Sequence, residues 1–282
     1  TMDLRAACGR QRGDRMKTNI FIEGVPGSGK STLLNWLARE WPEYRAYREG
    51  DLSPVELAWC SLLNGEKWEE ICGRYPALSQ EIRDRTAVED DRFIVAYTQI
   101  LAEDRVFYQE MERYEIYNGR VDFETFHGVI MDRYRRFCGE GNLFECSFFQ
   151  NSIESMMLFY QLPEEKILAF FEEAYGILRE KGFKLVYLDC TRIRESLLTI
   201  KKERSDENGT EMWYPLMLNF LKESPWGRAN GCEGTEDVIA HFERRRKLER
   251  RILLEVIKKD GLLMQAGGFA PESVPRRLRE LR

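Results

Sequence analysis

A glycine-rich segment is the feature that most restricts what this chain can fold into. Residues 24–31 read Gly-Val-Pro-Gly-Ser-Gly-Lys-Ser, which matches the spacing G-x-x-x-x-G-K-S. Glycines at these positions let the backbone wrap around a phosphate with its N–H groups pointing inward, and the following helix N-terminus adds the positive end of its dipole. The motif requires a strand before it and a helix after it. The sequence predicts the strand over Thr18–Glu23 and the helix over Ser31–Glu40.

The motif predicts a binding site for Mg²⁺ and a nucleoside triphosphate. Lys30 is expected to reach the β- and γ-phosphates, and the Ser31 hydroxyl is expected to bind the metal. The other expected contacts come from the loop and the first turn of the helix: Gly24, Val25, Pro26, Gly27, Ser28, Gly29 and Thr32. ATP is the expected nucleotide, with GTP as the alternative. No Asn-Lys-x-Asp motif for reading guanine occurs in the chain, which disfavours a GTPase switch.

Strand and helix patterns alternate along most of the chain. Beyond the first strand, apolar runs predict strands over Tyr44–Glu49, Asn142–Cys146, Phe183–Asp189 and Leu262–Gln265. Helices are predicted near Ile153–Tyr160, from Pro163 to Gly182, and over about Val238–Lys259. This alternation predicts an α/β fold with a parallel sheet of about five strands and helices on both faces.

One long segment interrupts the alternation. From Leu52 to Glu140 the pattern predicts mostly helix, including Phe93–Ile100 and a helix from Phe123 to Phe137 with Asp122 as its N-cap. We interpret residues 52–140 as a helical insert on the substrate side of a single domain that spans residues 17–282. The preceding residues 1–16 are expected to be a disordered N-terminal extension.

Three carboxylates are expected at the edge of the sheet where parallel strands end, which is where ligands bind in such folds. Glu145 ends the third strand and could hold Mg²⁺ or position the phosphate acceptor. Glu49 and Asp51 follow the second strand, and either could take the proton of an attacking hydroxyl. Each of the three could instead be a solvated acid of a loop or turn.

Two basic stretches allow two interpretations each. The cations that follow Phe183–Asp189 could close over a transferring phosphate, or could form a solvated helix face; they are Arg192, Arg194, Lys201, Lys202 and Arg204. Arg244–Arg246 and Arg250–Arg251 are interpreted as mostly surface residues paired with Glu243 and Glu249. Asp189 could imitate the second acidic motif of ATPases, but no Asp-Glu pair follows it. Phe148 and Phe149 fit a substrate pocket and a packed core equally well.

Composition narrows the classes of partner. The net charge of −5 disfavours nucleic acid, and no apolar run reaches the length of about 18 residues that a membrane span needs. Seven cysteines without a C-x-x-C pair indicate reduced thiols in a cytoplasmic protein. The two histidines, His127 and His241, are expected to have structural roles.

The order of these features resembles the P-loop nucleoside and nucleoside-monophosphate kinases, including thymidylate kinases and deoxynucleoside kinases. The resemblance rests on GVPGSGKST, on Glu49-Gly50-Asp51, on Glu145 followed by Ser147 and Gln150-Asn151, and on FKLVYLDC before a basic helix. Those families place Asp-Arg or Glu-Arg-Ser where this chain has Glu145-Cys146-Ser147. The missing arginine is one that they use near the substrate, which leaves the acceptor open.

The resemblance implies an ATP-dependent kinase that transfers the γ-phosphoryl group to a hydroxyl or phosphate of a small molecule. Lys30, Glu49, Asp51, Glu145 and Arg204 would act in catalysis, with Ser31 and Glu145 serving Mg²⁺. The alternative is a nucleotide-binding regulatory protein without an acceptor. A kinase acting on nucleic-acid ends is a further alternative, which the acidic balance disfavours. The sequence does not indicate an oligomeric state.

Overall fold

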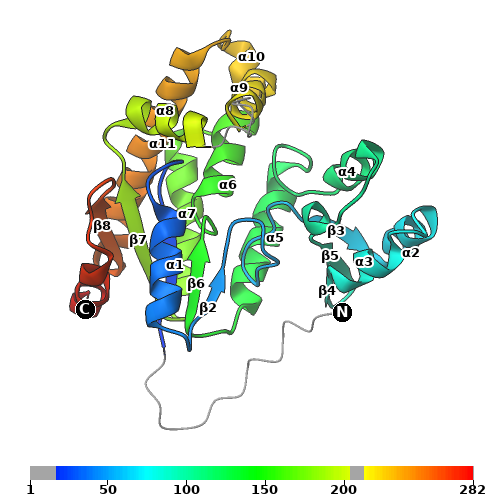
Figure 1. Cartoon of the computed structure of the whole chain (residues 1–282), viewed down its shortest axis with the longest axis horizontal. Coiled ribbons are helices and arrows are strands. Elements are labelled where there is room, and N and C mark those ends of the chain that lie inside the picture. The colour runs from blue at the N-terminus through cyan, green and yellow to red at the C-terminus, as the bar shows by residue number, and fades with distance from the viewer. Residues whose placement is uncertain (1–16, 204–212, 282) are drawn as a thin grey trace. The chain divides into compact units, whose positions relative to one another are not determined.

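A computed structural model describes residues 17–203 and 213–281, and of residues 201–203 it describes the backbone only. The chain divides into two compact units (Figure 1). Unit 2 consists of Lys17–Ala46 and Glu140–Arg282, and unit 1 contains the intervening residues Tyr47–Gly139. The expected N-terminal extension, residues 1–16, lies outside the described residues.

A five-stranded parallel sheet forms the centre of unit 2, with the strand order β2-β6-β1-β7-β8 (Figure 1). Its strands are β1 (Asn19–Glu23), β2 (Arg45–Tyr47), β6 (Asn142–Glu145), β7 (Phe183–Asp189) and β8 (Gly261–Gln265). The predicted α/β fold and each of the five predicted sheet strands are therefore confirmed. In this order β1 lies between β6 and β7. The loop that follows β1 therefore starts between the carboxyl ends of these two strands.

Alternation along β1 explains why helices cover both faces of the sheet. Ile20 and Ile22 point into an aliphatic cluster with Leu33, Leu34 and Leu37 of α1 (Lys30–Glu40), and Val274 and Leu278 of α12 (Val274–Glu280) belong to the same cluster. Phe21 points to the opposite face. There its ring stacks on Phe144 with 4.8 Å between centroids, in a layer of aromatic side chains that includes Phe148, Phe171 and Phe183.

The helices predicted near Ile153–Tyr160, from Pro163 and over about Val238–Lys259 are present among the remaining helices of unit 2. These remaining helices are α6 (Gln150–Glu154), the π-helical η2 (Ser155–Phe159), α7 (Glu164–Arg179), α8 (Ile193–Glu203), α9 (Trp213–Glu223), α10 (Pro225–Ala229), α11 (Thr235–Ile252), the π-helical η3 (Leu253–Ile257), and the 3₁₀ turns η4 (Lys258–Asp260) and η5 (Pro271–Ser273). Two predicted helices thus change to π-helical geometry in their last turns. π-helical geometry mostly occurs as single turns of this kind within α-helices.

Unit 1 differs from the predicted helical insert because it contains an antiparallel sheet with the strand order β3-β5-β4. Its elements are β3 (Ser61–Asn64), α2 (Gly65–Arg74), α3 (Ser79–Asp84), β4 (Thr86–Glu89), β5 (Arg92–Val95), η1 (Tyr97–Gln99), α4 (Arg105–Glu112) and α5 (Phe123–Arg136). The predicted helix over Phe93–Ile100 is wrong, since this segment forms the central strand and a 3₁₀ turn. The predicted helix from Phe123 is confirmed, and the Asp122 carboxylate caps it by accepting the Thr125 amide at 2.7 Å.

Six cysteines of the described residues, Cys60, Cys72, Cys138, Cys146, Cys190 and Cys232, are free thiols, as the sequence predicts. Within residues 17–203 and 213–281, no helix combines the length and the apolar character that a membrane crossing requires.

The aromatic layer yields a test of the fold. Replacing Phe21 by Ala should lower the free energy of unfolding by about 3–5 kcal/mol, because the ring is fully buried between Phe144 and Phe183 and its loss leaves a cavity. Leu216→Ala serves as the control, since Leu216 is 68% exposed and its loss should change stability by about 0.5 kcal/mol or less. Denaturant unfolding measures both. Equal losses for the two variants would contradict the described core.

Candidate functional site

The glycine-rich loop joins β1 to α1, which is the strand-and-helix setting that the motif requires. Gly24, Gly27 and Gly29 have positive φ angles of 147°, 74° and 95°. Gly29 is the N-cap of α1 and has left-handed geometry. Three residues with positive φ in six positions would be strained with side chains present, so glycine is required for this path of the backbone.

Close neighbours exclude side chains from the same loop. A Cβ atom on Gly24 would lie 2.6 Å from the Leu188 carbonyl oxygen at the end of β7. A Cβ atom on Gly27 would lie 2.4 Å from Ser196 Oγ and 2.6 Å from Ile200 Cδ1, both on α8. The helix that follows β7 therefore packs directly on the loop, and Ser196 Oγ also donates a hydrogen bond to the Pro26 carbonyl at 3.3 Å.

The Lys30 side chain folds back over the loop that precedes it. Its Nζ donates to the carbonyl oxygens of Gly24 at 2.8 Å and Val25 at 3.2 Å, and the residue is buried. The ammonium group is thus held by backbone carbonyls of the loop itself. A positive charge kept inside a loop of backbone amides favours an anionic ligand such as a phosphate.

The structure brings the two predicted metal ligands together. Ser31 Oγ, in the first turn of α1, donates to Glu145 Oε1 at 2.5 Å. Parallel pairing accounts for this contact, because Ile22 of β1 is in register with Glu145 of β6, so the loop after β1 starts beside the end of β6. A hydroxyl and a carboxylate oxygen at this distance are the ligand types that Mg²⁺ takes from proteins, and phosphates and water complete its coordination.

A strained corner follows Glu145. Cys146 has a φ of 55°, which is unfavourable for a residue with a β-carbon, and its amide donates to the Ile22 carbonyl at 3.2 Å. Ser147 Oγ donates to the Glu145 carbonyl at 3.0 Å. Such strain persists only where surrounding contacts fix the backbone. Phe148 and Phe149 after the corner lie in the aromatic core, which decides between their two interpretations in favour of packing.

Sequence reasoning missed Glu23, the last residue of β1. It is fully buried, and its Oε1 accepts the Phe148 amide at 2.7 Å. Burial is the largest cause that raises the pKa of Glu23 to about 8, and the negative charge of Glu249 acts in the same direction. The amides of Phe148 and Phe149 and the charge of Lys30 act against it. Glu23 is therefore a neutral acid at neutral pH, directly before the loop. Its position at the end of an apolar strand was the available signal.

Asp189, at the end of β7, is engaged by two arginines of α11. Arg246 Nε and Nη2 donate to its two oxygens at 2.5 and 3.0 Å, and Arg250 donates to Oδ2 as well. Asp189 is buried and charge-compensated. It therefore anchors α11 to the sheet. Arg246 and Arg250 are partly exposed, but they pair with Asp189 and not with the predicted Glu243 or Glu249.

Arg245 was also predicted to lie on the surface, and this prediction is wrong. It is fully buried between Glu154 of α6 and Glu249 of α11. His241 Nε2 lies 2.8 Å from Glu154, and the Tyr187 hydroxyl donates to Glu249 at 2.8 Å. His241 and Arg245 hold the pKa of the Glu154 carboxyl at about 2 against the opposing effect of its burial. Glu249 is thus a partner of Arg245, as predicted, and His241 has the expected structural role. Arg244 stacks on the Trp226 ring, and Arg251 pairs with Glu164 and Glu255.

The predicted cationic lid is described only in part. Arg192 and Arg194 are exposed and pair with Glu195 and Glu236. Arg204 and the side chains of Lys201 and Lys202 lie outside the described residues. Two uncharged residues of α8, Ser196 and Ile200, contact the glycine-rich loop.

Glu49 and Asp51 belong to unit 1, in the turn after β2. The Asp51 carboxylate accepts the Arg48 amide at 2.8 Å, and the Asp51 amide donates to the Arg48 carbonyl at 3.0 Å. Gly50, with a φ of 86°, completes the turn, and its carbonyl accepts Gln99 Nε2 at 2.7 Å. Asp51 therefore closes a turn, whatever further role it has.

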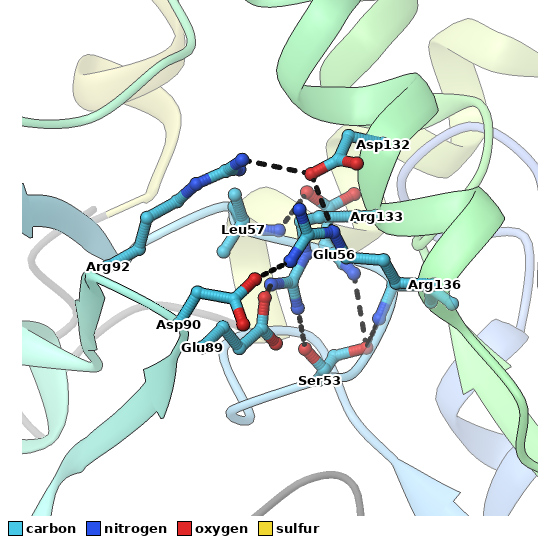
Figure 2. Close-up of polar contacts among 10 residues, drawn as sticks. Ser53, Glu56, Leu57, Glu89, Asp90, Arg92, Asp132, Arg133 and Arg136 are labelled. Carbon is cyan, nitrogen blue, oxygen red and sulfur yellow. Dashed lines mark hydrogen bonds and ion pairs between the residues drawn. The ribbon is translucent and has the colours of Figure 1, made fainter.

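Unit 1 contains a second group of charges that sequence reasoning did not single out (Figure 2). Arg133 of α5 is buried and donates to Glu89 Oε2 and to the Ser53 carbonyl, each at 2.6 Å. Glu56 Oε1 accepts the amides of Leu57 and Ala58 at 2.8 Å and also the Tyr117 hydroxyl. Nearer the surface, Arg92 and Arg136 share Asp132, and Arg136 also pairs with Asp90 (Figure 2). Through these contacts Arg133 connects Ser53 and β4 to α5, and Tyr117 holds Glu56.

Comparison with known proteins adds no family to this geometry. No protein-family model matches the chain, and no curated protein matches it significantly in sequence. The functional argument therefore depends on the residues described above.

The buried Glu23 carboxyl predicts a pH-dependent contribution to stability. Between pH 4.5 and about 8 the unfolded chain loses this proton while the folded chain keeps it, so the free energy of unfolding falls as pH rises. Glu23→Gln removes the titrating group and keeps the acceptor for Phe148. Relative to this variant, wild-type stability should fall by up to about 1.4 kcal/mol per pH unit in that interval.

Denaturant unfolding of both proteins at several pH values measures this difference. The decline should end above the folded pKa of about 8, where both states have lost the proton. Parallel pH profiles for wild type and Glu23→Gln would show that Glu23 is ionised in the folded protein.

Proposed function

We propose that this chain is an ATP-dependent kinase that transfers the γ-phosphoryl group of Mg·ATP to a hydroxyl or phosphate of a small molecule. The observation that carries the proposal is the contact between Ser31 and Glu145 at the end of a loop whose glycines require positive φ. Glu145 ends β6, and Ser31 lies in the helix that follows the loop from the adjacent strand β1. A loop that can surround phosphates and a pair of oxygens that can hold the accompanying metal thus occur together, which supports a P-loop site.

Residues of the loop and of α1 divide the binding of the donor. The amides of Gly24–Ser31 and the positive end of α1 would hold phosphate oxygens, and Lys30 would exchange its loop carbonyls for the β- and γ-phosphates. Thr32 lies beside Ser31 in the same exposed first turn. Ser31 and Glu145 would hold Mg²⁺, which neutralises charge on the phosphates and orients them. Catalysis would consist mostly of positioning and electrostatic stabilisation.

The acceptor side of the proposal involves three residues. Glu49 and Asp51 remain the candidates for orienting the acceptor, and Arg204 remains the candidate for neutralising charge on the transferred group. Asp51 already accepts the Arg48 amide through Oδ2. An Asn side chain can keep this hydrogen bond through its carbonyl oxygen, so Asp51→Asn separates a chemical role from the role in the turn.

Loss of the Lys30 ammonium should abolish most nucleotide binding while the fold survives. The Lys30 ammonium contacts loop carbonyls, whereas Leu33, Leu34 and Leu37 provide the part of the core cluster that α1 contributes. We expect Lys30→Ala to weaken Mg·ATP binding by about a hundredfold, the scale of a lost charge-assisted contact to phosphate. Calorimetry measures the affinity, and Lys166→Ala, which changes an exposed lysine of α7, is the control. Equal affinities for wild type and Lys30→Ala would contradict the assignment of the loop.

A screen of small alcohols and phosphates first identifies the acceptor that most stimulates ATP consumption. Turnover with this acceptor is then measured for wild type, Asp51→Asn, Glu49→Gln and Glu145→Gln. Asp51→Asn should leave ATP binding intact and lower turnover by about a hundredfold or more, because that is the scale of a lost general base. Glu145→Gln should instead raise the Mg²⁺ concentration required.

If only Glu49→Gln loses turnover, Glu49 and not Asp51 orients the acceptor. If Glu49→Gln and Asp51→Asn both turn over normally, this turn has a structural role only. If no acceptor stimulates ATP consumption while Mg·ATP still binds, the chain is a nucleotide-binding protein without a small-molecule acceptor.

A further inference from the structure

Glu23 connects two segments that the proposed site requires. Its backbone ends β1 and is followed directly by Gly24, so it fixes where the loop begins. Its side chain reaches to the corner after β6, where Oε1 accepts the Phe148 amide at 2.7 Å. Oε2 is buried and has no hydrogen-bond partner among the described residues. A single side chain thus spans the gap between the start of the loop and the segment that carries Glu145.

The corner needs such a contact because its backbone is unfavourable. Cys146 has a φ of 55°, and one amide, that of Cys146, continues the pairing with β1 beyond Glu145. Removing the Glu23 acceptor would take a hydrogen bond away from the Phe148 amide in a buried segment, since Phe148 is 1% exposed. The corner could then relax toward a less strained path. Any rotation at residues 146–148 would move Glu145, which directly precedes them, away from Ser31.

We propose that Glu23 is a positioning residue, which ties the corner at residues 146–148 to the start of the phosphate loop and thereby holds Glu145 in place for the metal. This inference rests on the proposed function, because it concerns the same Ser31–Glu145 pair. In the proposed arrangement, Glu23 contacts neither the metal nor the nucleotide. The required property is a hydrogen-bond acceptor at the distance of a glutamate side chain, and a negative charge is not required.

Three substitutions separate these properties. Glu23→Gln keeps an acceptor oxygen at the same reach. Glu23→Met keeps the volume and removes the acceptor. Glu23→Asp keeps the carboxyl group but shortens its reach by one methylene, and it replaces Glu23→Met in every comparison if that variant does not fold.

The matched control is Asn19→Leu, which removes a side-chain tie between the same two strands at their opposite ends. Asn19 Oδ1 accepts the amide and the side-chain Nδ2 of Asn142, at 3.1 and 2.8 Å. Asn19 starts β1 and Asn142 starts β6, whereas Glu23 and Glu145 end them. A general loss of pairing between β1 and β6 would therefore affect the control as well.

The experiment titrates Mg²⁺ into each variant saturated with a non-hydrolysable ATP analogue, and separately measures binding of the analogue in the presence of EDTA. We expect Glu23→Met to weaken Mg²⁺ binding by about tenfold or more, which is the scale for partners that orient metal ligands. Affinity for the metal-free analogue, which the loop amides and Lys30 determine, should change by less than about threefold. Glu23→Gln and Asn19→Leu should retain the Mg²⁺ affinity of wild type.

Four results would overturn the inference. They are a Mg²⁺ affinity for Glu23→Met within about twofold of wild type, an equal loss for Glu23→Gln, an equal loss for Asn19→Leu, and a parallel loss of metal-free nucleotide binding. The last three would indicate a need for charge, a general weakening of the sheet and a distorted loop, respectively.

Hydrogen exchange without nucleotide keeps this inference separate from the proposed function. Glu23→Met should speed exchange in residues 146–150, and Glu23→Gln should not. If wild type binds no nucleotide, the proposed function fails, and this exchange comparison decides whether Glu23 holds the corner. Unchanged exchange in Glu23→Met would overturn the inference in either case.

Discussion

Parallel pairing of β1 with β6 and β7 is the constraint on which the site depends. It brings the carboxyl ends of three strands to one edge of the sheet, and each of these ends carries an acid: Glu23, Glu145 and Asp189. The glycine-rich loop leaves from the middle strand of the three. The Leu188 carbonyl of β7 therefore lies close to Gly24 on one side of the loop. On the other side, Glu145 of β6 accepts a hydrogen bond from Ser31. In an open parallel sheet this edge is where ligands bind.

The three acids have different environments and therefore different tasks. Asp189 is neutralised by Arg246 and Arg250 and attaches α11 to the sheet. Glu23 is buried without a cation in contact, which raises its pKa to about 8 and makes it a neutral hydrogen-bonding group. Only Glu145 combines a position at the strand end with a hydroxyl partner from the loop helix. Equivalent positions in a parallel sheet thus provide an anchor, a tie between backbone segments and a candidate metal ligand.

Much of unit 2 could be predicted from the sequence because its signals are local. Strands buried on both faces appear as short apolar runs, and the loop requires glycine at positions that side chains cannot occupy. The insert was mispredicted because Phe93–Val95 is a continuous apolar run, whose periodicity does not distinguish a buried strand from a helix. Its antiparallel partners, β3 and β4, lie outside any local window around it.

The roles of charged residues were harder to predict than the elements that carry them. Arg245, Arg246 and Arg250 look like a solvated helix face in sequence, yet their partners Glu154 and Asp189 come from segments more than fifty residues away. The buried Glu23 likewise has its hydrogen-bond donor, the Phe148 amide, 125 residues away in the sequence. Long-range pairing of this kind leaves no periodic signal in a single sequence, whereas the contact between Ser31 and Glu145 could be anticipated from strand order.

The most direct test of the central claim is a crystal structure of the protein with Mn²⁺ and a non-hydrolysable ATP analogue, with the metal located by its anomalous scattering. The account predicts a metal within coordination distance of Ser31 Oγ, with Glu145 bound to it directly or through one water. It also predicts that Lys30 Nζ has left the Gly24 carbonyl for the phosphates. A nucleotide bound away from residues 24–31, or a metal that contacts neither Ser31 nor Glu145, would contradict the account.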